Sequence, residues 1–218
     1  MAAEVIAFSV QTGSGGYAIA RRVAERLGFR YYDWEITSEA ARRAGVSPND
    51  VIAAERVPSF LERMMQRLGA ISTLSAEGAT VFADPSPSVW NTALQSLTSD
   101  DYRQFIERVV EELADQGRAV IVGHAAQHTL RERPGVLKVL IHGSLRHRAQ
   151  RLALEQGLDL AKAEAMVKQS DKDRRELLKT VYHFDWQDAG VYDLSINTDR
   201  LPDEFAIETV AAAAAELP

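Results

Sequence analysis

A glycine-rich loop follows the first apolar run of the chain. Residues 4–10 (EVIAFSV) are apolar and rich in β-branched side chains, which is typical of a buried strand, and helical spacing begins near Ile19. Between a strand and a helix, glycines let successive backbone N–H groups turn toward one point, and the helix N-terminus adds its positive end. We therefore predict that this loop binds phosphate through Gly13, Ser14, Gly15, Gly16 and Tyr17.

The loop lacks two groups of a standard phosphate-binding loop. That pattern ends in a lysine for the β- and γ-phosphates and a Ser or Thr hydroxyl for Mg²⁺, and here Gly16 and Tyr17 stand in those positions. No other alignment supplies the lysine, because the first lysine of the chain is Lys138. The position between strand and helix favours phosphate binding, and a glycine turn with a purely structural role is the alternative.

Positive charge gathers in a later segment. Residues 146–179 contain nine Lys or Arg against six Asp or Glu, in a chain whose net charge is −6. Arg148 and Arg151 are three residues apart and share a helix face. Asp171 and Arg174 repeat that spacing on the next charged helix. A basic segment in an acidic chain suits a small anionic ligand better than a long nucleic acid, and salt bridges on solvated helices are the structural alternative.

Short apolar runs alternate with helical segments along the chain, which predicts an α/β fold with a parallel sheet and helices on both faces. Ligands of such sheets bind at the carboxyl ends of the strands. Strands are expected at residues 4–10, 29–33, 119–123, 136–142 and 193–197. Helices are expected directly after the glycine loop and at residues 35–44, 58–75, 100–116, 145–156, 158–181 (as one helix or two) and 202–217, with a loop or mobile flap at 76–93.

The segment from Ile6 to Asp33 resembles the opening of the cytidylate-kinase-like proteins, a branch of the P-loop nucleoside monophosphate kinases in which glycine replaces the loop lysine. Tyr32-Asp33-Trp34-Glu35 matches the second motif of that family. The resemblance covers most of the chain and is weakest over residues 45–115. Its other matching blocks are residues 120–123, 145–151, 171–174 and 192–199.

This resemblance implies a three-layer P-loop kinase-like fold, with a five-stranded parallel sheet and a helical lid, over residues 1–218 as a single domain. The flap or acceptor region is expected at about 45–98 and the lid at about 146–190. The resemblance also implies roles for the charged residues. Arg148, Arg151 and Arg174 would clamp phosphates as catalytic residues, and Asp171 would orient an arginine or the acceptor. Lys172 is a candidate replacement for the missing lysine.

Two further residues are candidates for an acceptor site. Asp33 ends the second predicted strand, where its carboxylate can accept from an exocyclic amine or a ribose hydroxyl; a helix N-cap is an equal alternative. His124 stands in Gly123-His124-Ala125, where the family commonly has a G-R-G motif, and imidazole cannot reproduce an arginine fork. Family members also commonly carry Arg-Glu where this chain has Val10-Gln11. Because of these departures, the resemblance does not fix which substrate is used or the rate of turnover.

The implied activity is transfer of the γ-phosphoryl group of ATP to a nucleoside monophosphate such as CMP, or to another small acceptor. The alternative is a nucleotide- or phosphate-binding protein that has lost efficient catalysis and acts through ligand-dependent lid closure. Mg²⁺ is expected with ATP but without an identifiable protein ligand, because the third strand ends in Val122-Gly123 and lacks an aspartate. His124 and His128 have the spacing of a zinc pair without a third ligand.

Composition removes several classes of protein. The chain has 218 residues and no cysteine, which excludes disulfides and thiolate metal sites. Its hydrophobic fraction of 46% is sufficient for one sizeable core. No apolar run approaches the ~20 residues that span a bilayer, and no signal segment is recognised. We expect a cytoplasmic protein with small-molecule partners and with neither a membrane nor a long nucleic acid as partner; homo-oligomer formation is left open.

Overall fold

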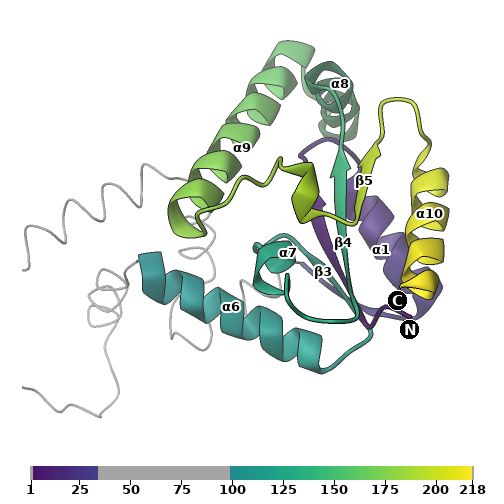
Figure 1. Ribbon diagram of the computed structural model, residues 1–218. Coiled ribbons are helices and arrows are strands. Elements are labelled where there is room, and N and C mark those ends of the chain that lie inside the picture. The colour runs from purple at the N-terminus through teal and green to yellow at the C-terminus, as the bar shows by residue number, and fades with distance from the viewer. Residues whose placement is uncertain (1, 34–98, 218) are drawn as a thin grey trace, which may run out of the picture.

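The computed structural model describes residues 2–33 and 99–217. Within these ranges one parallel sheet of five strands has the order β2-β3-β1-β4-β5 (Figure 1). The predicted parallel sheet is confirmed, and each strand end lies within one residue of its expected position. The strands are β1 (Val5–Val10), β2 (Arg30–Tyr32), β3 (Ala119–Val122), β4 (Val136–His142) and β5 (Leu194–Asn197).

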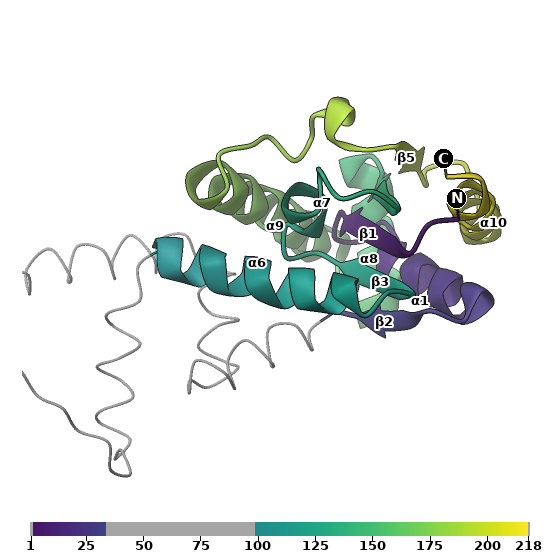
Figure 2. The same cartoon turned by 60° about the horizontal axis from the view of Figure 1, so that its bottom comes forward.

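Helices cover both faces of this sheet and complete the predicted three layers (Figure 2). One face carries α1 (Gly16–Leu27) and α10 (Asp203–Glu216), and the other carries α6 (Ser99–Asp115) and the short α7 (Ala126–Thr129). Two further helices, α8 (Leu145–Gln156) and α9 (Leu160–Val181), stand at the end of the sheet toward which β4 points (Figure 1). A short 3-10 helix, η1 (Ala189–Val191), precedes β5.

The sequence of the central strand β1 is apolar without alternation because the strand is buried on both faces. Successive side chains of a strand point to opposite faces, and both faces of this sheet are covered. Ile6 and Phe8 pack in the core formed with α1 and α10, whereas Val5 and Ala7 pack in the core formed with α6 and α7. Because β1 is also the middle strand of the five, the loop that follows Val10 lies in the middle of the carboxyl edge of the sheet.

A tight turn joins the two helices of the predicted lid. Gly157 ends α8 with a left-handed backbone of φ 63°, which glycine adopts without strain. Asp159 then caps α9, because its carboxylate accepts from the Lys162 N–H at 2.9 Å. The segment predicted as one helix or two is a single helix that begins after this cap.

Several predictions lie outside the described residues. They are the helices at 35–44 and 58–75, the flap at 76–93 and the whole flap or acceptor region at 45–98. The assignment of the whole chain to one domain stays a prediction. In the part of the chain that the structure describes, no helix has both the length and the apolar character needed to cross a membrane.

Candidate functional site

The loop between β1 and α1 is a compact turn at the centre of the sheet edge. The Ser14 N–H donates to the Gln11 carbonyl oxygen at 3.0 Å, and the Ser14 hydroxyl accepts from the Gly16 N–H at 3.3 Å. Gly13 and Gly15 have left-handed backbones, with φ of 79° and 77°. Among the described residues, no protein group accepts a hydrogen bond from the N–H of Gly13 or Gly15. The loop thus presents backbone donors beside a helix N-terminus, which suits an anion.

Packing explains why position 16 carries no side chain. A Cβ on Gly16 would lie 2.5 Å from Val10 Cγ1, which is closer than carbon atoms approach in proteins, and 3.0 Å from Ile141 Cβ, which is a very tight contact. In this shape the loop has no room for the lysine of a standard phosphate loop. Positive charge for a phosphate must therefore come from other segments.

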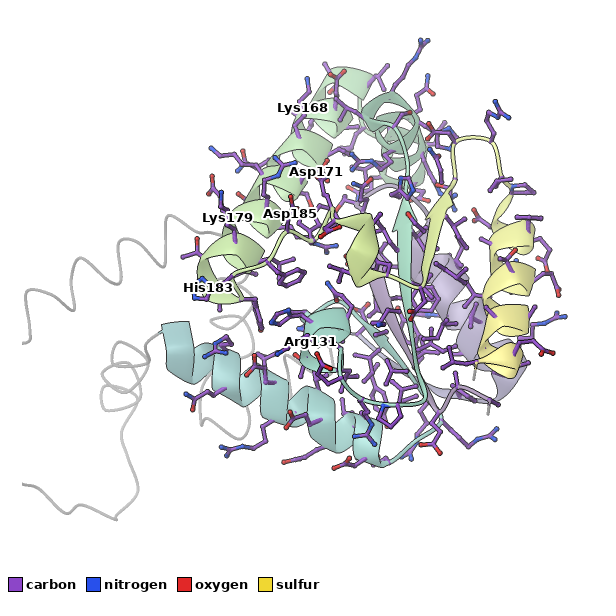
Figure 3. The ribbon with its side chains drawn as sticks, in the orientation of Figure 1. Arg131, Lys168, Asp171, Lys179, His183 and Asp185 are labelled. Carbon is purple, nitrogen blue, oxygen red and sulfur yellow. The ribbon has the colours of Figure 1, made fainter. Side chains whose placement is uncertain are left out.

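Arg148 is the most deeply buried of the three predicted arginines, with 3% of its surface exposed. Its guanidinium forms a two-point pair with the Asp171 carboxylate at 3.0 and 2.7 Å. It also donates to the carbonyl oxygens of Thr12 at 3.3 Å and Gly143 at 2.9 Å. Figure 3 shows Asp171 on the side of α9 that faces the sheet. The predicted arrangement in which Asp171 orients an arginine is therefore present in the geometry.

Arg151 lies beside the loop and is neutralised by two carboxylates. Its guanidinium occupies the space that a Cβ on Gly15 would need. It forms a two-point pair with Asp203 at 2.9 and 2.6 Å and donates through Nε to Glu155 at 3.0 Å. The hydrogen bonds that Arg151 donates to Asp203 raise the pKa of Arg151 above its ordinary value; burial opposes this shift and Glu155 reinforces it. This arginine consequently ties α8 to α10 beside the glycine loop.

Arg174 differs from the other two arginines in its partners. Its guanidinium donates to the Val10 carbonyl oxygen at the end of β1, and its central carbon lies 5.3 Å from the centroid of the buried Trp186 ring. Within residues 2–33 and 99–217, no carboxylate oxygen lies within 4.0 Å of its nitrogens. Arg174 therefore brings a positive charge without a carboxylate partner to the strand end from which the loop departs.

The structure does not bring Lys172 to the glycine loop. Its side chain is 64% exposed and lies 3.8 Å from the Glu176 carboxylate, one turn along α9. Adjacent residues of a helix point about 100° apart, so Lys172 turns away from the face that carries Asp171. The geometry gives no support to its predicted role as a replacement for the loop lysine.

The two predicted acceptor residues meet at the ends of β2 and β3. His124 Nε2 lies 3.1 Å from the Asp33 carbonyl oxygen. The Tyr31 hydroxyl donates to the Asp33 carboxylate at 3.4 Å, and burial, followed by the charge of Asp33, raises the pKa of Tyr31 well above its ordinary value. The Tyr31 phenol therefore stays protonated and keeps donating to Asp33. That the Asp33 carboxylate accepts from an exocyclic amine or a ribose hydroxyl of the acceptor remains a prediction.

The turn after β3 contains an unusual backbone. Gly123, His124 and Ala125 all have left-handed φ values, of 81°, 54° and 53°. For residues that carry a Cβ this conformation stores about 1–2 kcal/mol each, and such strain concentrates at functional sites. This turn holds the His124 imidazole against the end of β2.

Sequence reasoning missed several residues that border the glycine loop. The Thr198 hydroxyl donates to the Ser14 carbonyl oxygen at 3.0 Å, and the hydroxyls of Thr12 and Ser170 lie 2.7 Å apart. Asp203, which pairs with Arg151, was also missed. Two of these residues had a signal in the sequence, because Thr198 lies within the matched block 192–199 and Ser170 directly precedes the block 171–174. No spacing pattern connects Arg151 with Asp203, which is distant along the chain. No group of three or more His, Asp or Glu side chains in the described parts is placed to hold a metal ion.

A parallel sheet of this strand order, with a glycine loop between its central strand and the first helix, defines the class of P-loop kinase folds. The chain belongs to the cytidylate kinase-like family, whose model matches residues 5–200. A cytidylate kinase of Methanothrix thermoacetophila is 28% identical over 210 residues, which cover 96% of each chain.

Solved structures agree on the fold. A protein from Eubacterium ventriosum aligns with a TM-score of 0.66 at 18% identity and covers 96% of this chain and 97% of its own. A gluconokinase from Sinorhizobium meliloti aligns with a TM-score of 0.52 at 16% identity, over 97% and 91% of the two chains. The family model confirms the membership predicted from the motifs, and the solved structures agree with the predicted fold.

Proposed function

We propose that this protein transfers the γ-phosphoryl group of ATP to a nucleoside monophosphate of the CMP type, or to another small acceptor. The observation that carries the proposal is Arg174, whose charge has no carboxylate partner among the described residues and lies at the end of β1, where the glycine loop begins. Phosphoryl transfer needs positioning and positive charge around the transferred group more than covalent chemistry. Family membership supports the same reaction class.

The glycine loop supplies the nucleotide end of this site. The N–H groups of Gly13, Gly15, Gly16 and Tyr17 bind phosphate oxygens, helped by the N-terminus of α1. Arg174 exchanges its bond to the Val10 carbonyl oxygen for the γ-phosphoryl group, where charge grows in the transition state. In this scheme Arg174 takes over the electrostatic work of the lysine that position 16 cannot hold.

Asp33 and His124 supply the acceptor end. Both lie at the carboxyl edge of the sheet, where ligands of parallel sheets bind. The Asp33 carboxylate accepts from an exocyclic amine or a hydroxyl of the acceptor, while the Tyr31 phenol fixes its position. His124 holds the backbone of the same residue and offers its ring to a phosphate or base.

ATP-dependent kinases employ Mg²⁺, and the described residues do not provide a protein site for it. No carboxylate ends β3, and no cluster of three or more metal-binding side chains occurs in the parts of the chain that the structure describes. A metal that enters with ATP would be held by phosphate oxygens and water. None of the steps assigned here to protein side chains passes through the metal.

A second function is favoured by a different observation. Arg148 and Arg151 are already neutralised by Asp171, Asp203 and Glu155, so they are poorly disposed to bind phosphate. A nucleotide-binding protein with weakened catalysis, responding to its ligand through movement of α8 and α9, is consistent with that neutralisation.

One experiment separates the two functions. ATP turnover is measured with CMP, other nucleoside monophosphates, nucleosides and small alcohols, and ATP affinity is measured by calorimetry on the same protein. Under the kinase proposal Arg174→Met lowers turnover by ~10²-fold or more with a much smaller change in ATP affinity. The matched control is Arg175→Met, because Arg175 is an exposed neighbour that donates to Gln187. ATP binding without turnover for any acceptor supports the binding protein instead.

A further inference from the structure

Arg148 has almost no hydrogen-bonding capacity left for a ligand. A guanidinium carries five N–H donors, and four of them are engaged: Nε by Gly143, one Nη1 donor each by Thr12 and Asp171, and one Nη2 donor by Asp171. The Asp171 carboxylate also neutralises the charge in a pair that is mostly buried. A side chain in this state is poorly suited to meet the charge of a phosphoryl group.

The partners of Arg148 all belong to segments that surround the glycine loop. Thr12 is the residue directly before Gly13, and Gly143 lies in the turn between β4 and α8. The backbone carbonyl of Arg148 itself fills the space beside Gly13, where any Cβ would overlap it. The side chain of Arg148 therefore contacts Thr12, and its backbone lies beside Gly13, the next residue of the loop.

Helix α9 reinforces the same point of the loop. Ser170, the residue before Asp171, brings its hydroxyl to 2.7 Å from the Thr12 hydroxyl. Thr12 is thus held through its carbonyl by Arg148 and through its hydroxyl by α9. Because Gly13 and Gly15 are free to adopt many backbone conformations, a loop built from them needs such external contacts to keep its N–H groups directed at one point.

We propose that Arg148 is a positioning residue that holds the phosphate-binding loop in its anion-binding shape, with Asp171 as its counterion, and that it does not contact the transferred phosphoryl group. This inference rests on the proposed function only for the identity of the ligand that the loop binds. The two arginines thus have different roles, since Arg174 meets the ligand and Arg148 shapes the loop that receives it.

The test compares Arg148→Lys and Asp171→Asn with the control Arg146→Lys, an exposed arginine of the same helix. Lysine keeps the charge and loses the planar fork that reaches two carbonyls and a carboxylate at once. Amide hydrogen exchange is measured for Ser14 and Gly16, whose N–H groups are hydrogen-bonded within the loop, and for Ile6 and Phe8 in the core strand. ATP affinity is measured by calorimetry and turnover by a coupled assay.

We expect Arg148→Lys and Asp171→Asn to accelerate exchange of Ser14 and Gly16 by ~10-fold and to weaken ATP binding by a similar factor, while exchange of Ile6 and Phe8 and all properties of Arg146→Lys stay unchanged. A fall in turnover with unchanged loop exchange and unchanged ATP affinity would overturn the inference, because that pattern belongs to a group that acts only in the transition state. Uniform acceleration in loop and core would overturn it as well, since it indicates a general loss of stability.

The outcome is independent of whether the protein is a kinase. A wild-type protein that binds ATP without turnover defeats the proposed function, yet loop exchange and ATP affinity still decide the role of Arg148. Should Arg148→Lys fail to fold, Asp171→Asn, which keeps the size of the side chain and removes its charge, gives the same decision.

Discussion

Val10 and Gly16 oppose each other across the glycine loop so closely that the side chain of one excludes a side chain on the other. A Cβ on Gly16 would lie 2.5 Å from Cγ1 and 2.8 Å from Cγ2 of Val10. The side chain of Val10, six positions earlier in the chain, therefore fills the space that a side chain at position 16 would need. A change of the glycine alone leaves that bulk in place.

We predict that Gly16→Ala lowers the free energy of unfolding by about 1–3 kcal/mol, because overpacked side chains force their neighbours apart. The loss should be smaller when measured against a Val10→Ala background, with a coupling of about 0.5–3 kcal/mol between the two sites. Urea unfolding of the four proteins gives this coupling. Equal losses in both backgrounds would show that contact with Val10 is not the cause. Gly16→Lys should likewise destabilise the protein and add no phosphate contact.

Gly15 and Gly157 form a matched pair for testing the phosphate loop. Both have left-handed backbones, but only a Cβ on Gly15 meets a neighbour, the Arg151 guanidinium. We predict that alanine at either position lowers stability by about 1–2 kcal/mol, the strain of a left-handed residue. Only Gly15→Ala should weaken ATP binding, because only there does the added group displace an arginine beside the loop. Calorimetry with ATP and urea unfolding measure the two effects, and equal ATP affinity in both variants would contradict the assignment of the loop.

The Tyr31 hydroxyl should affect binding of the acceptor and leave binding of ATP unchanged. It donates to the Asp33 carboxylate at 3.4 Å, so Tyr31→Phe leaves that carboxylate less firmly placed. We predict a rise in KM for the acceptor of about tenfold with the KM for ATP unchanged, as expected for loss of one hydrogen bond to a charged group. Tyr32→Phe is the control, because the Tyr32 hydroxyl faces Gln116 at 3.5 Å. A change in the KM for ATP alone would place Asp33 outside the acceptor site.

The free energy of unfolding should fall when the pH drops below the usual histidine pKa of 6.5. The His128 ring stacks on Phe184 with centroids 4.5 Å apart, and burial, followed by the charges of Arg131 and Arg103, lowers the pKa of His128 below its usual 6.5. Between the lowered folded value and 6.5, the unfolded chain binds the proton more readily than the folded chain does. The stabilisation is therefore complete above 6.5 and is lost as the pH falls through the folded value.

We predict a smaller free energy of unfolding at about pH 5.5 than at about pH 7.5, and a reduced difference in His128→Phe, which keeps the stacked ring and removes the titrating group. Urea unfolding at the two pH values measures it. Part of the difference should remain in His128→Phe, because burial lowers the pKa of His142 as well. An identical pH difference in both proteins would show that His128 is not a source of the effect.

The layered fold was predictable because its signals are local. Each buried strand is a short apolar run, and Gly157, which ends α8, stands where the helical pattern stops. The four-residue α7 was not predicted, since so short a segment shows no periodicity. The glycine loop was recognised from its place between strand and helix, which is again information from neighbouring residues.

The partners of the charged residues were only partly predictable. Spacing placed Arg148 with Arg151, and Asp171 with Arg174, on shared helix faces, but it could not tell that Asp171 neutralises Arg148 or that Arg151 pairs with Asp203 on another helix. Helical spacing reports neighbours within one helix, whereas the partners come from packing between helices. Spacing also could not tell which way Lys172 points, so the sequence made it a candidate for the loop, whereas its side chain turns outward.

The pairing of β1 has a consequence for the order in which the site is completed during synthesis. The loop leaves the ribosome early, yet β1 pairs with residues 119–122 and 136–141, Thr198 holds Ser14, and Asp203 fixes the arginine beside Gly15. Until those later residues have been translated, the nascent chain contains the phosphate-binding residues without the surroundings that shape them. Nucleotide can therefore stabilise this protein only after residues up to Asp203 have been translated, and the shorter nascent chain must remain unaggregated without help from its ligand.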